Sequence, residues 1–252
     1  MLGDWLEPVL LAVAGLVSGC INAVAGGGSL LVFPALLGTG LPPLAANVTN
    51  SVAQAPGFVG AALSQRRDLV SNGRRLLSIS IAAVLGSGGG CALLLTLPGE
   101  VFDAVVPALV GLSAVLMAFQ NRIRKWLGNP DQHGPDKTVL LTAGIFLASI
   151  YGGYFGGARS VIFVVILVLT ANATLRTLNA AKNWLSLLGS AVTVVVYALL
   201  APVDWVAVAA LVPTTLLGGV IGGKVAQRLP AAGLRWTVVV IAAAVAIYMA
   251  VD

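Results

Sequence analysis

The sequence contains little charge. Only 9% of its 252 residues are Asp, Glu, Lys or Arg, whereas 58% are hydrophobic and the mean hydropathy is +0.99. Soluble globular domains carry about 25% charged residues. The composition therefore excludes an ordinary soluble domain and predicts a polytopic membrane protein that is surrounded by the lipid bilayer.

Groups for acid–base or metal chemistry are equally scarce. The single histidine, His133, lies in a polar stretch, and no nucleophile is paired with a base, so we do not expect an enzyme. Cys20 and Cys91 lie far apart in apolar surroundings, which favours packing over a disulfide or a metal site. We expect no cofactor. We also expect no nucleic-acid binding, because the basic residues follow loops rather than one face with interleaved aromatics.

Glycine, by contrast, is abundant and clustered. Gly26, Gly27 and Gly28, followed by Ser29, interrupt the apolar run from Val9 to Leu41. Each glycine costs a helix about 1 kcal/mol relative to alanine, so the helix should break here. In lipid, a broken backbone is tolerated only where it is buried in protein or lines a wet cavity. The break therefore predicts a site.

A second interruption occurs 130 positions later, where Gly156 and Gly157 are followed by Ala158 and Arg159. The same offset aligns Phe33 with Phe163. Two glycine clusters also correspond, and both are typical of the small faces through which membrane helices pack closely: Gly86, Gly88, Gly89 and Gly90 in the first half, and Gly218, Gly219, Gly222 and Gly223 in the second. These correspondences predict a duplicated chain.

We predict an all-α polytopic membrane protein with two repeats of about five helical segments each. Residues 1–120 form the first repeat, residues 121–137 a cytoplasmic linker and residues 138–252 the second repeat. The segment after each glycine break is too short to cross the roughly 30 Å core, which indicates half of a hairpin or a tilted, broken helix. The expected segments are Val9–Ala25, Leu30–Leu41, Asn47–Leu63, Leu76–Leu97, Val101–Phe119, Thr138–Phe155, Ser160–Thr170, Trp184–Leu200, Trp205–Gly223 and Leu234–Val251.

The loop charges predict the orientation. Three loops are rich in Lys and Arg and are therefore placed in the cytoplasm, whereas the remaining connections carry only Asp and Glu. Both termini then lie on the outer side of the cell membrane. In a bacterium with two membranes, this is the inner membrane. The first repeat's basic loop matches the second repeat's acidic turn at Asp204, so the repeats are inverted, as in many secondary transporters.

Arg159 is the one strongly basic residue that directly follows a glycine break. An arginine at such depth normally faces a partner or a water-filled path. Its guanidinium suits sulfonate, sulfite or carboxylate groups. Because no intramembrane Asp or Glu is available to neutralise it, we predict a receptor for a small anionic substrate; the alternatives are snorkelling or a structural tie to a carbonyl.

Other polar residues near the breaks complete the predicted site. The corner Asn47 to Ser51 corresponds to the corner Asn179 to Asn183, and its side chains serve either as helix caps or as ligand contacts. Lys182 either lines an anion path or snorkels. Asn22 and Tyr151 either donate to the substrate or satisfy loosened carbonyls. The predicted substrate-binding residues are Asn22, Gly26, Gly27, Gly28, Ser29, Thr49, Asn50, Tyr151, Gly156, Gly157, Arg159, Asn179, Lys182 and Asn183.

Several of these motifs together resemble the sulfite exporter TauE/SafE family. They are Ala25-Gly26-Gly27-Gly28-Ser29, Pro34 with Leu36-Leu37, Ala45-Ala46-Asn47-Val48-Thr49-Asn50-Ser51, Tyr151-Gly152-Gly153-Tyr154-Phe155-Gly156-Gly157-Ala158 and Asn179-Ala180-Ala181-Lys182-Asn183. The resemblance covers nearly the whole chain and implies movement of sulfur-containing and other organic anions across the cytoplasmic membrane, usually outward. Ala158 and Arg159 stand where a further glycine and an uncharged residue are more usual, which makes Arg159 a candidate for tuning selectivity.

We therefore predict an exporter of small organic or sulfur-containing anions such as sulfite or sulfonates, working by alternating access around the two breaks. One exported negative charge gains about 2.3 kcal/mol per 100 mV of interior-negative potential, so no coupled ion is required. Sodium coupling, an anion channel, and an assembly or anchoring subunit without transport activity stay open. The pattern also leaves open whether the chain forms a homo-oligomer.

Overall fold

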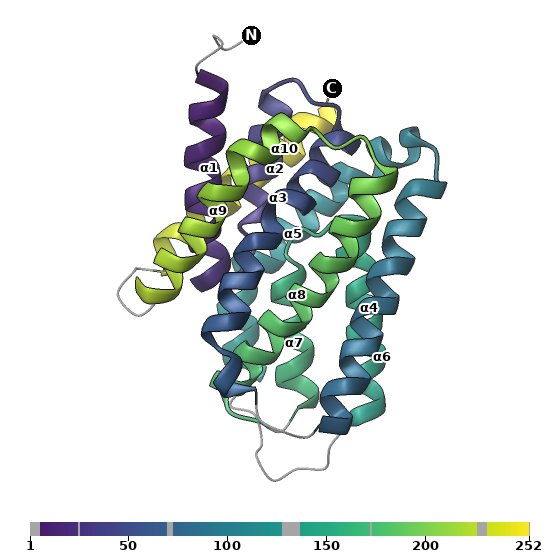
Figure 1. The fold of residues 1–252 in the computed structure, drawn as a ribbon, viewed down its shortest axis with the longest axis vertical. Coiled ribbons are helices and arrows are strands. Elements are labelled where there is room, and N and C mark those ends of the chain that lie inside the picture. Colours follow the sequence, from purple (N-terminus) through teal and green to yellow (C-terminus); the bar gives the residue numbers. More distant parts are fainter. Residues whose placement is uncertain are drawn as a thin grey trace.

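The computed structural model describes residues 6–24, 26–69, 73–127, 137–171, 173–225 and 231–251. Within these ranges the chain forms α-helices and one 3-10 turn, and no strand, which confirms the all-α prediction (Figure 1). The elements are α1 (Leu6–Val24), α2 (Ser29–Gly38), α3 (Pro43–Ser64), η1 (Arg66–Asp68), α4 (Gly73–Thr96), α5 (Gly99–Leu127), α6 (Thr138–Tyr154), α7 (Arg159–Thr170), α8 (Leu175–Leu200), α9 (Trp205–Val225) and α10 (Ala231–Val251).

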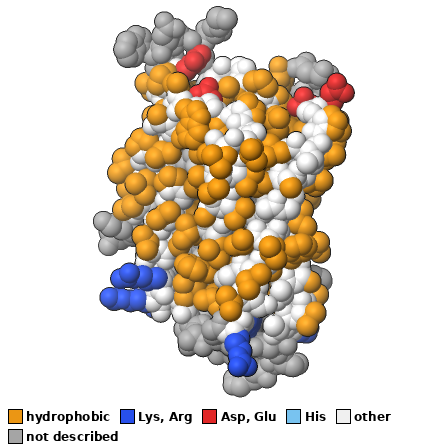
Figure 2. All heavy atoms as spheres, turned by 45° about the vertical axis from the view of Figure 1, so that its right-hand side comes forward, with side chains coloured by type: hydrophobic (Ala, Val, Ile, Leu, Met, Phe, Trp, Pro, Cys, Tyr) orange, Lys and Arg blue, Asp and Glu red, His pale blue; other side chains and the backbone are white. Residues whose placement is uncertain are grey.

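Apolar side chains cover the middle of the molecule, as a bilayer requires (Figure 2). Among the described residues, four helical stretches are long and apolar enough to cross a membrane, and they belong to α4, α5, α8 and α9. Many large hydrophobic side chains on these helices face outward; Leu77 is 61% exposed and Val206 is 82% exposed. Such exposure is costly in water and favourable in lipid, so this surface is the lipid-facing one.

Both predicted helix breaks are confirmed. Between α1 and α2, Gly26 and Gly27 have φ angles of 78° and 86°. Between α6 and α7, Gly156 has a φ of 77° and Ala158 a φ of 53°. Positive φ ends a right-handed helix and is readily adopted by glycine alone, whereas Ala158 adopts it at a cost of about 1–2 kcal/mol.

The two helices that follow the breaks are halves rather than full crossings. α2 has 10 residues and α7 has 12. At 1.5 Å per residue they are about 15 Å and 18 Å long, short of the roughly 30 Å core. α2 lies in the upper half of the molecule and α7 in the lower half (Figure 1). Because their first residues, Ser29 and Arg159, line one cavity, the two half-helices run outward from the centre in opposite directions.

Helix contacts repeat between the two halves of the chain. α1 packs on α9 as α6 packs on α4, and α3 packs on α9 as α8 packs on α4. α2 packs on α10 as α7 packs on α5, while α3 contacts α8 and α5 contacts α10. If each helix is replaced by its counterpart in the other half, with α1 to α5 corresponding to α6 to α10 in order, this set of contacts stays the same. This pattern supports the prediction of two repeats, which we keep as a proposal.

Glycines provide the closest of these contacts. A Cβ atom on Gly86 or Gly90 would overlap backbone oxygens of Phe146 or Ile150 on α6. A Cβ atom on Gly218 would likewise overlap the Leu16 oxygen on α1, and one on Gly222 would lie 2.7 Å from Cys20 Cα. In both helix pairs, glycines four residues apart let backbones approach, which confirms the packing interpretation for these four. Gly88 and Gly89 meet nothing closer than 4.0 Å.

Charged side chains are separated between the two ends (Figure 2). Asp and Glu gather at the upper end, where α1 begins and α10 ends, and Lys and Arg gather at the lower end (Figure 2). At the lower end, Nε of Arg176 lies 2.9 Å from a carboxylate oxygen of Asp68, and Arg176 is 81% exposed. Arg176 therefore belongs to the basic end of the molecule.

The predicted helix starts were too late for α3 and α8. α3 begins at Pro43, directly after Pro42, because proline suits the first turn of a helix. α8 begins after Thr174, whose Oγ1 caps the helix by accepting from the Thr177 N–H at 3.3 Å. The two polar corners therefore lie within helices, and helix-start capping by Asn47, Thr49 and Asn50 is wrong. α5 also continues to Leu127, into the stretch predicted as a linker. Residues 128–136 of that stretch lie outside the described residues.

The glycine contacts predict a position-specific effect on stability. Gly90→Ala should lower the free energy of unfolding by about 1–3 kcal/mol, because its Cβ would overlap the Ile150 oxygen on α6. Gly89→Ala, on the exposed side of the same turn, should leave stability unchanged or raise it by about 1 kcal/mol. Reversible unfolding in detergent micelles measures both. Equal losses in the two variants would show that close backbone approach is not what Gly90 provides.

Candidate functional site

A small cavity lies where α2 and α7 begin. Its volume is about 20 Å³, room for about one water molecule, so the site is closed to any larger solute in this structure. Residues from both breaks and from the long helices α3 and α8 line it: Ser29, Asn50, Ser51, Gln54, Phe58, Gly152, Phe155, Gly156, Arg159, Ser190 and Thr193. The structure thus brings the two breaks, 130 positions apart in sequence, to one place.

Arg159 is the charged group of this cavity. It is 5% exposed, and its Nη2 donates to Ser190 Oγ at 3.0 Å and to the Ser186 carbonyl at 3.4 Å. The guanidinium carbon lies 5.5 Å from the centre of the Phe58 ring, a cation–π distance. Nε is buried and has no hydrogen-bond partner. Snorkelling is therefore wrong. The tie to a carbonyl is present, and Nε is left without a partner.

Two glycines make room for this side chain. A Cβ atom on Gly152 of α6 would overlap Cδ of Arg159, and one on Gly189 of α8 would lie 3.0 Å from its Nη1. Real Cβ atoms do not show the overlap found at Gly152, and the contact at Gly189 is tighter than most, so the guanidinium lies in a slot that these two glycines leave open. The slot fixes Arg159 between α6 and α8 and directs it to the cavity.

No carboxylate lines the cavity among the described residues. The described acidic residues lie instead at or near helix ends: Glu7, Asp68, Glu100, Asp103 and Asp204. The N-termini of α2 and α7, at Ser29 and Arg159, both meet the cavity, and helix N-termini favour negative charge. The local field is therefore positive.

The freed backbone groups of both breaks are paired by neighbouring helices. At the end of α6, Asn47 Nδ2 donates to the Tyr154 carbonyl at 2.9 Å, and the Tyr197 hydroxyl donates to the Gly153 carbonyl. At the start of α2, the Gly28 N–H donates to Asn22 Oδ1 at 2.8 Å. A break in lipid is stable only with such partners.

An amide network on α3 holds the first break. Asn22 Nδ2 donates to Gln54 Oε1 at 2.8 Å, and Gln54 Nε2 donates to Ser18 Oγ at 2.6 Å and to Asn50 Oδ1 at 3.3 Å. Asn50 Nδ2 donates to the Ser29 carbonyl at 3.2 Å. Asn22 thus pairs a loosened N–H of the break, where the prediction had it satisfy carbonyls, and it does not line the cavity.

Four of the predicted site residues line the cavity, namely Ser29, Asn50, Gly156 and Arg159. Four glycines of the breaks pack elsewhere: a Cβ atom would meet Ser160 at Gly26, Met117 at Gly27, Ser18 at Gly28 and Phe155 at Gly157.

Two further predicted residues make contacts outside the cavity. The Tyr151 hydroxyl lies 2.6 Å from Ser113 Oγ. Thr49 Oγ1 accepts from the Asp204 N–H at 2.9 Å, close to the start of α9. Both groups are satisfied within the fold.

The second polar corner lies on the first turns of α8, toward the basic end. Asn179 is exposed, and Asn183 Nδ2 donates to Gln65 Oε1 at 3.1 Å. Lys182 is buried at 4% exposure. Eight residues separate it from Ser190, or about 12 Å along the helix axis. None of these three residues lines the cavity.

Sequence reasoning missed the cavity residues of the unbroken helices, among them Gln54, Phe58, Ser190 and Thr193. A signal for them exists. Polar or aromatic residues recur three or four positions apart on otherwise apolar helices, as Asn50, Gln54 and Phe58 on α3 and as Ser186, Ser190 and Thr193 on α8. That spacing places each set on one helix face.

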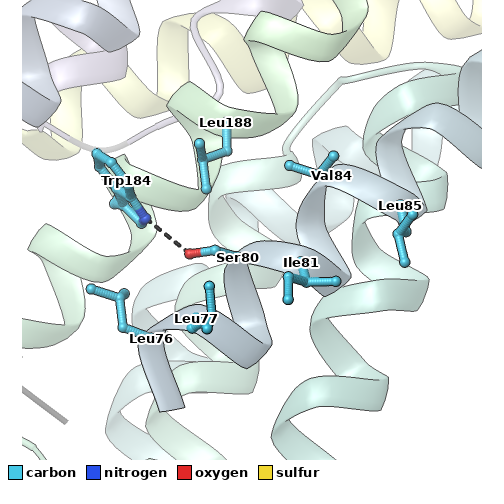
Figure 3. A pocket seen from close by; sticks show the side chains of 8 residues that line it. All are labelled: Leu76, Leu77, Ser80, Ile81, Val84, Leu85, Trp184 and Leu188. Atoms are coloured by element: carbon cyan, nitrogen blue, oxygen red, sulfur yellow. Dashed lines mark hydrogen bonds between the residues drawn. The ribbon is translucent and has the colours of Figure 1, made fainter. Parts of the chain in front are cut away.

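Two of the larger hollows of the molecule are apolar, and a third, of about 490 Å³ between α5 and α10, is lined by the carboxylate of Asp103 and so disfavours anions. One of about 460 Å³ lies between α4 and α8, where Leu77, Ile81 and Leu85 surround it and Trp184 Nε1 donates to Ser80 Oγ at 3.0 Å (Figure 3). Another, of about 570 Å³, lies between α4 and α6. Charged solutes are disfavoured in such surroundings. The small polar cavity is therefore the candidate site.

The slot around Arg159 predicts a coupling between two residues. Gly152→Ala should destabilise the protein by about 1–3 kcal/mol, because the new Cβ overlaps Arg159. In an Arg159→Ala background the same substitution should cost far less, since the atoms that it meets are gone. Thermal unfolding of the four proteins of this cycle measures the coupling. Gly60→Ala, whose nearest contact is 3.9 Å, is the matched control and should be additive with Arg159→Ala. Additivity for Gly152 would contradict the slot.

Comparison with known proteins agrees with this architecture. The sulfite exporter TauE/SafE family matches residues 11–249. A probable membrane transporter protein, ORF9 of Sinorhizobium sp., is 26% identical over 96% of this chain and 92% of its own. The probable membrane transporter protein YfcA of Escherichia coli is 30% identical over 71% of this chain and 69% of its own, and one of Haemophilus influenzae is 30% identical over 64% and 62%. The chain therefore belongs to the sulfite exporter TauE/SafE family and is a membrane transporter.

Proposed function

We propose that this transporter carries small organic or sulfur-containing anions through the closed cavity between its two helix breaks. One observation carries the proposal: Arg159 is buried beside the cavity with an unpartnered Nε–H, and no lining residue is a carboxylate. A buried charge without a counter-ion is costly, so the site gains stability from binding an anion. The guanidinium and the N-termini of α2 and α7 are the recognising groups.

The closed cavity favours alternating access over an open channel. About 20 Å³ is too small for any sulfur oxyanion, so helices must move before a substrate enters. Half-helices that meet at the midplane between two inverted repeats are a recurrent design of secondary transporters. We assign the repeats to residues 1–120 and 138–252, each with one half-helix, α2 or α7.

The charge separation supports an orientation. Positively charged loops stay in the cytoplasm, so the lower, basic end faces inward and both termini face outward (Figure 2). We place the protein in the inner cell membrane. With an interior-negative potential, an anion gains free energy on leaving, which favours export without a coupled ion.

Removing the charge of Arg159 tests the proposal. Arg159→Gln should abolish saturable uptake of sulfite or methanesulfonate into proteoliposomes, and these anions should no longer raise its melting temperature. Arg159→Lys should retain part of both responses because it keeps the charge but loses the planar fork. Arg176→Gln, which removes an exposed arginine far from the cavity, is the matched control and should behave as wild type.

Two results would contradict the proposal. Retained flux in Arg159→Gln would remove Arg159 from the transport path. Absence of flux and of thermal stabilisation in the wild type, over a panel of sulfur oxyanions, sulfonates and carboxylates, would favour a different substrate class or an assembly role. Flux that neither saturates nor shows counterflow would indicate a channel.

A further inference from the structure

We infer that the central site accepts anions that carry a single negative charge and rejects dianions of the same size. The inference deepens the proposed function and rests on it, since it takes the cavity at the two breaks as the place where the transported anion binds. It follows from the number of charges and donors around the cavity and from the chemistry of its walls.

The side chains of the cavity supply one full positive charge. Arg159 is the one Lys or Arg among the described lining residues, and the buried Lys182 does not line it. A monoanion paired with Arg159 leaves only the partial positive charges of the α2 and α7 N-termini. A dianion adds a second full negative charge, which these partial charges offset only in part and which carries the desolvation cost of a buried charge. The site therefore discriminates by charge as well as by size.

The neutral donors around the cavity are partly committed. Both amide protons of Gln54 are used by Ser18 and Asn50, and Asn50 Nδ2 is used by the Ser29 carbonyl. These groups stabilise the first helix break, and one Nδ2 proton of Asn50 is the amide donor left for a ligand. A dianion thus finds few additional amide donors to replace its hydration shell.

The donors that remain suit one oxyanion group. Arg159 Nε has no partner, and the hydroxyls of Ser29 and Ser51 donate to no other described residue. Ser190 Oγ accepts from Arg159, which leaves its own proton for a ligand. A rotating hydroxyl donates one hydrogen bond and carries no net charge. The guanidinium N–H groups that remain, together with these hydroxyls, match the oxygens of a single sulfonate, hydrogensulfite or carboxylate.

The aromatic walls disfavour a second charge. Phe58 and Phe155 line the cavity, and Phe58 turns its ring toward the guanidinium at 5.5 Å. The faces of aromatic rings carry partial negative charge, so they attract the cation and repel an anion, while tolerating C–H groups. The walls therefore favour a monoanion with one compact oxyanion head, whose remaining surface is apolar.

Two anions of fixed charge test the inference in wild-type protein. Methanesulfonate carries one charge and sulfate two at neutral pH, and both present oxygens on a tetrahedral sulfur. We expect saturable methanesulfonate uptake into proteoliposomes with a preference over sulfate of at least about tenfold. Each transported methanesulfonate should carry one charge, measured as current under a set potential. Equal uptake of both anions, with dependence on Arg159, would overturn the inference and leave the proposed function standing.

Methylphosphonate separates charge from size within one solute. It is a monoanion below its second pKa and a dianion above it, whereas methanesulfonate stays a monoanion throughout. Methylphosphonate uptake should fall as the pH rises through that pKa, while methanesulfonate uptake stays level. A methylphosphonate uptake that is level with pH, or that rises, would overturn the charge rule. Absence of uptake for every anion in the set would instead contradict the proposed function.

A second positively charged side chain at the cavity should weaken the preference for monoanions over dianions. Thr193→Lys adds a charge to the α8 side of the cavity, at a residue whose hydroxyl donates only to the Ser190 carbonyl. The variant should gain sulfate uptake relative to methanesulfonate by at least about tenfold. Thr193→Gln, similar in reach and neutral, is the matched control. An unchanged ratio of sulfate to methanesulfonate uptake in a folded Thr193→Lys protein would contradict selection by charge. If this variant does not fold, the wild-type comparisons above decide the inference.

Discussion

A backbone broken inside a bilayer must have its freed N–H and C=O groups paired, and the rest of this structure depends on that requirement. Side chains of other helices supply part of this pairing. Asn47 on α3 and Tyr197 on α8 satisfy carbonyls of α6, and Asn22 on α1 satisfies an N–H at Gly28. The long helices are therefore polar on the faces that meet the breaks and apolar elsewhere, and the centre of the protein is where its polar groups concentrate.

The same centre keeps a positive charge that it does not neutralise. Gly152 and Gly189 leave the slot for Arg159, Ser190 and Ser186 hold one end of its guanidinium, and Phe58 stacks on it. These contacts fix the side chain in one place without removing its charge. An anion receptor requires both properties, since a fixed charge loses little entropy on binding and an unneutralised one gains a partner.

The close glycine packing and the small cavity both bear on the alternating-access mechanism that we propose. Gly86 and Gly90 join α4 to α6, and Gly218 and Gly222 join α9 to α1, so each of the helices that precede a break is held by a tight partner. Because their backbones are in contact, we propose that such pairs move as rigid units. A closed cavity between two rigid units opens to one side or the other when the units rock, which is how we propose that the anion passes.

The sequence by itself determined the membrane class, the two breaks and the special position of Arg159, because composition, glycine clusters and charge in an apolar run act locally on the backbone and on solvation. Only the tertiary structure decided that both breaks meet at one cavity, that Asn22 and Tyr151 serve the frame, and that Gln54 and Ser190 line the site. Nothing in the local sequence indicated that the two polar corners, Asn47 to Ser51 and Asn179 to Asn183, lie within helices. Side chains such as Arg159 and Ser190, 31 positions apart, become neighbours through helix packing, and packing depends on contacts between distant segments that local patterns do not encode.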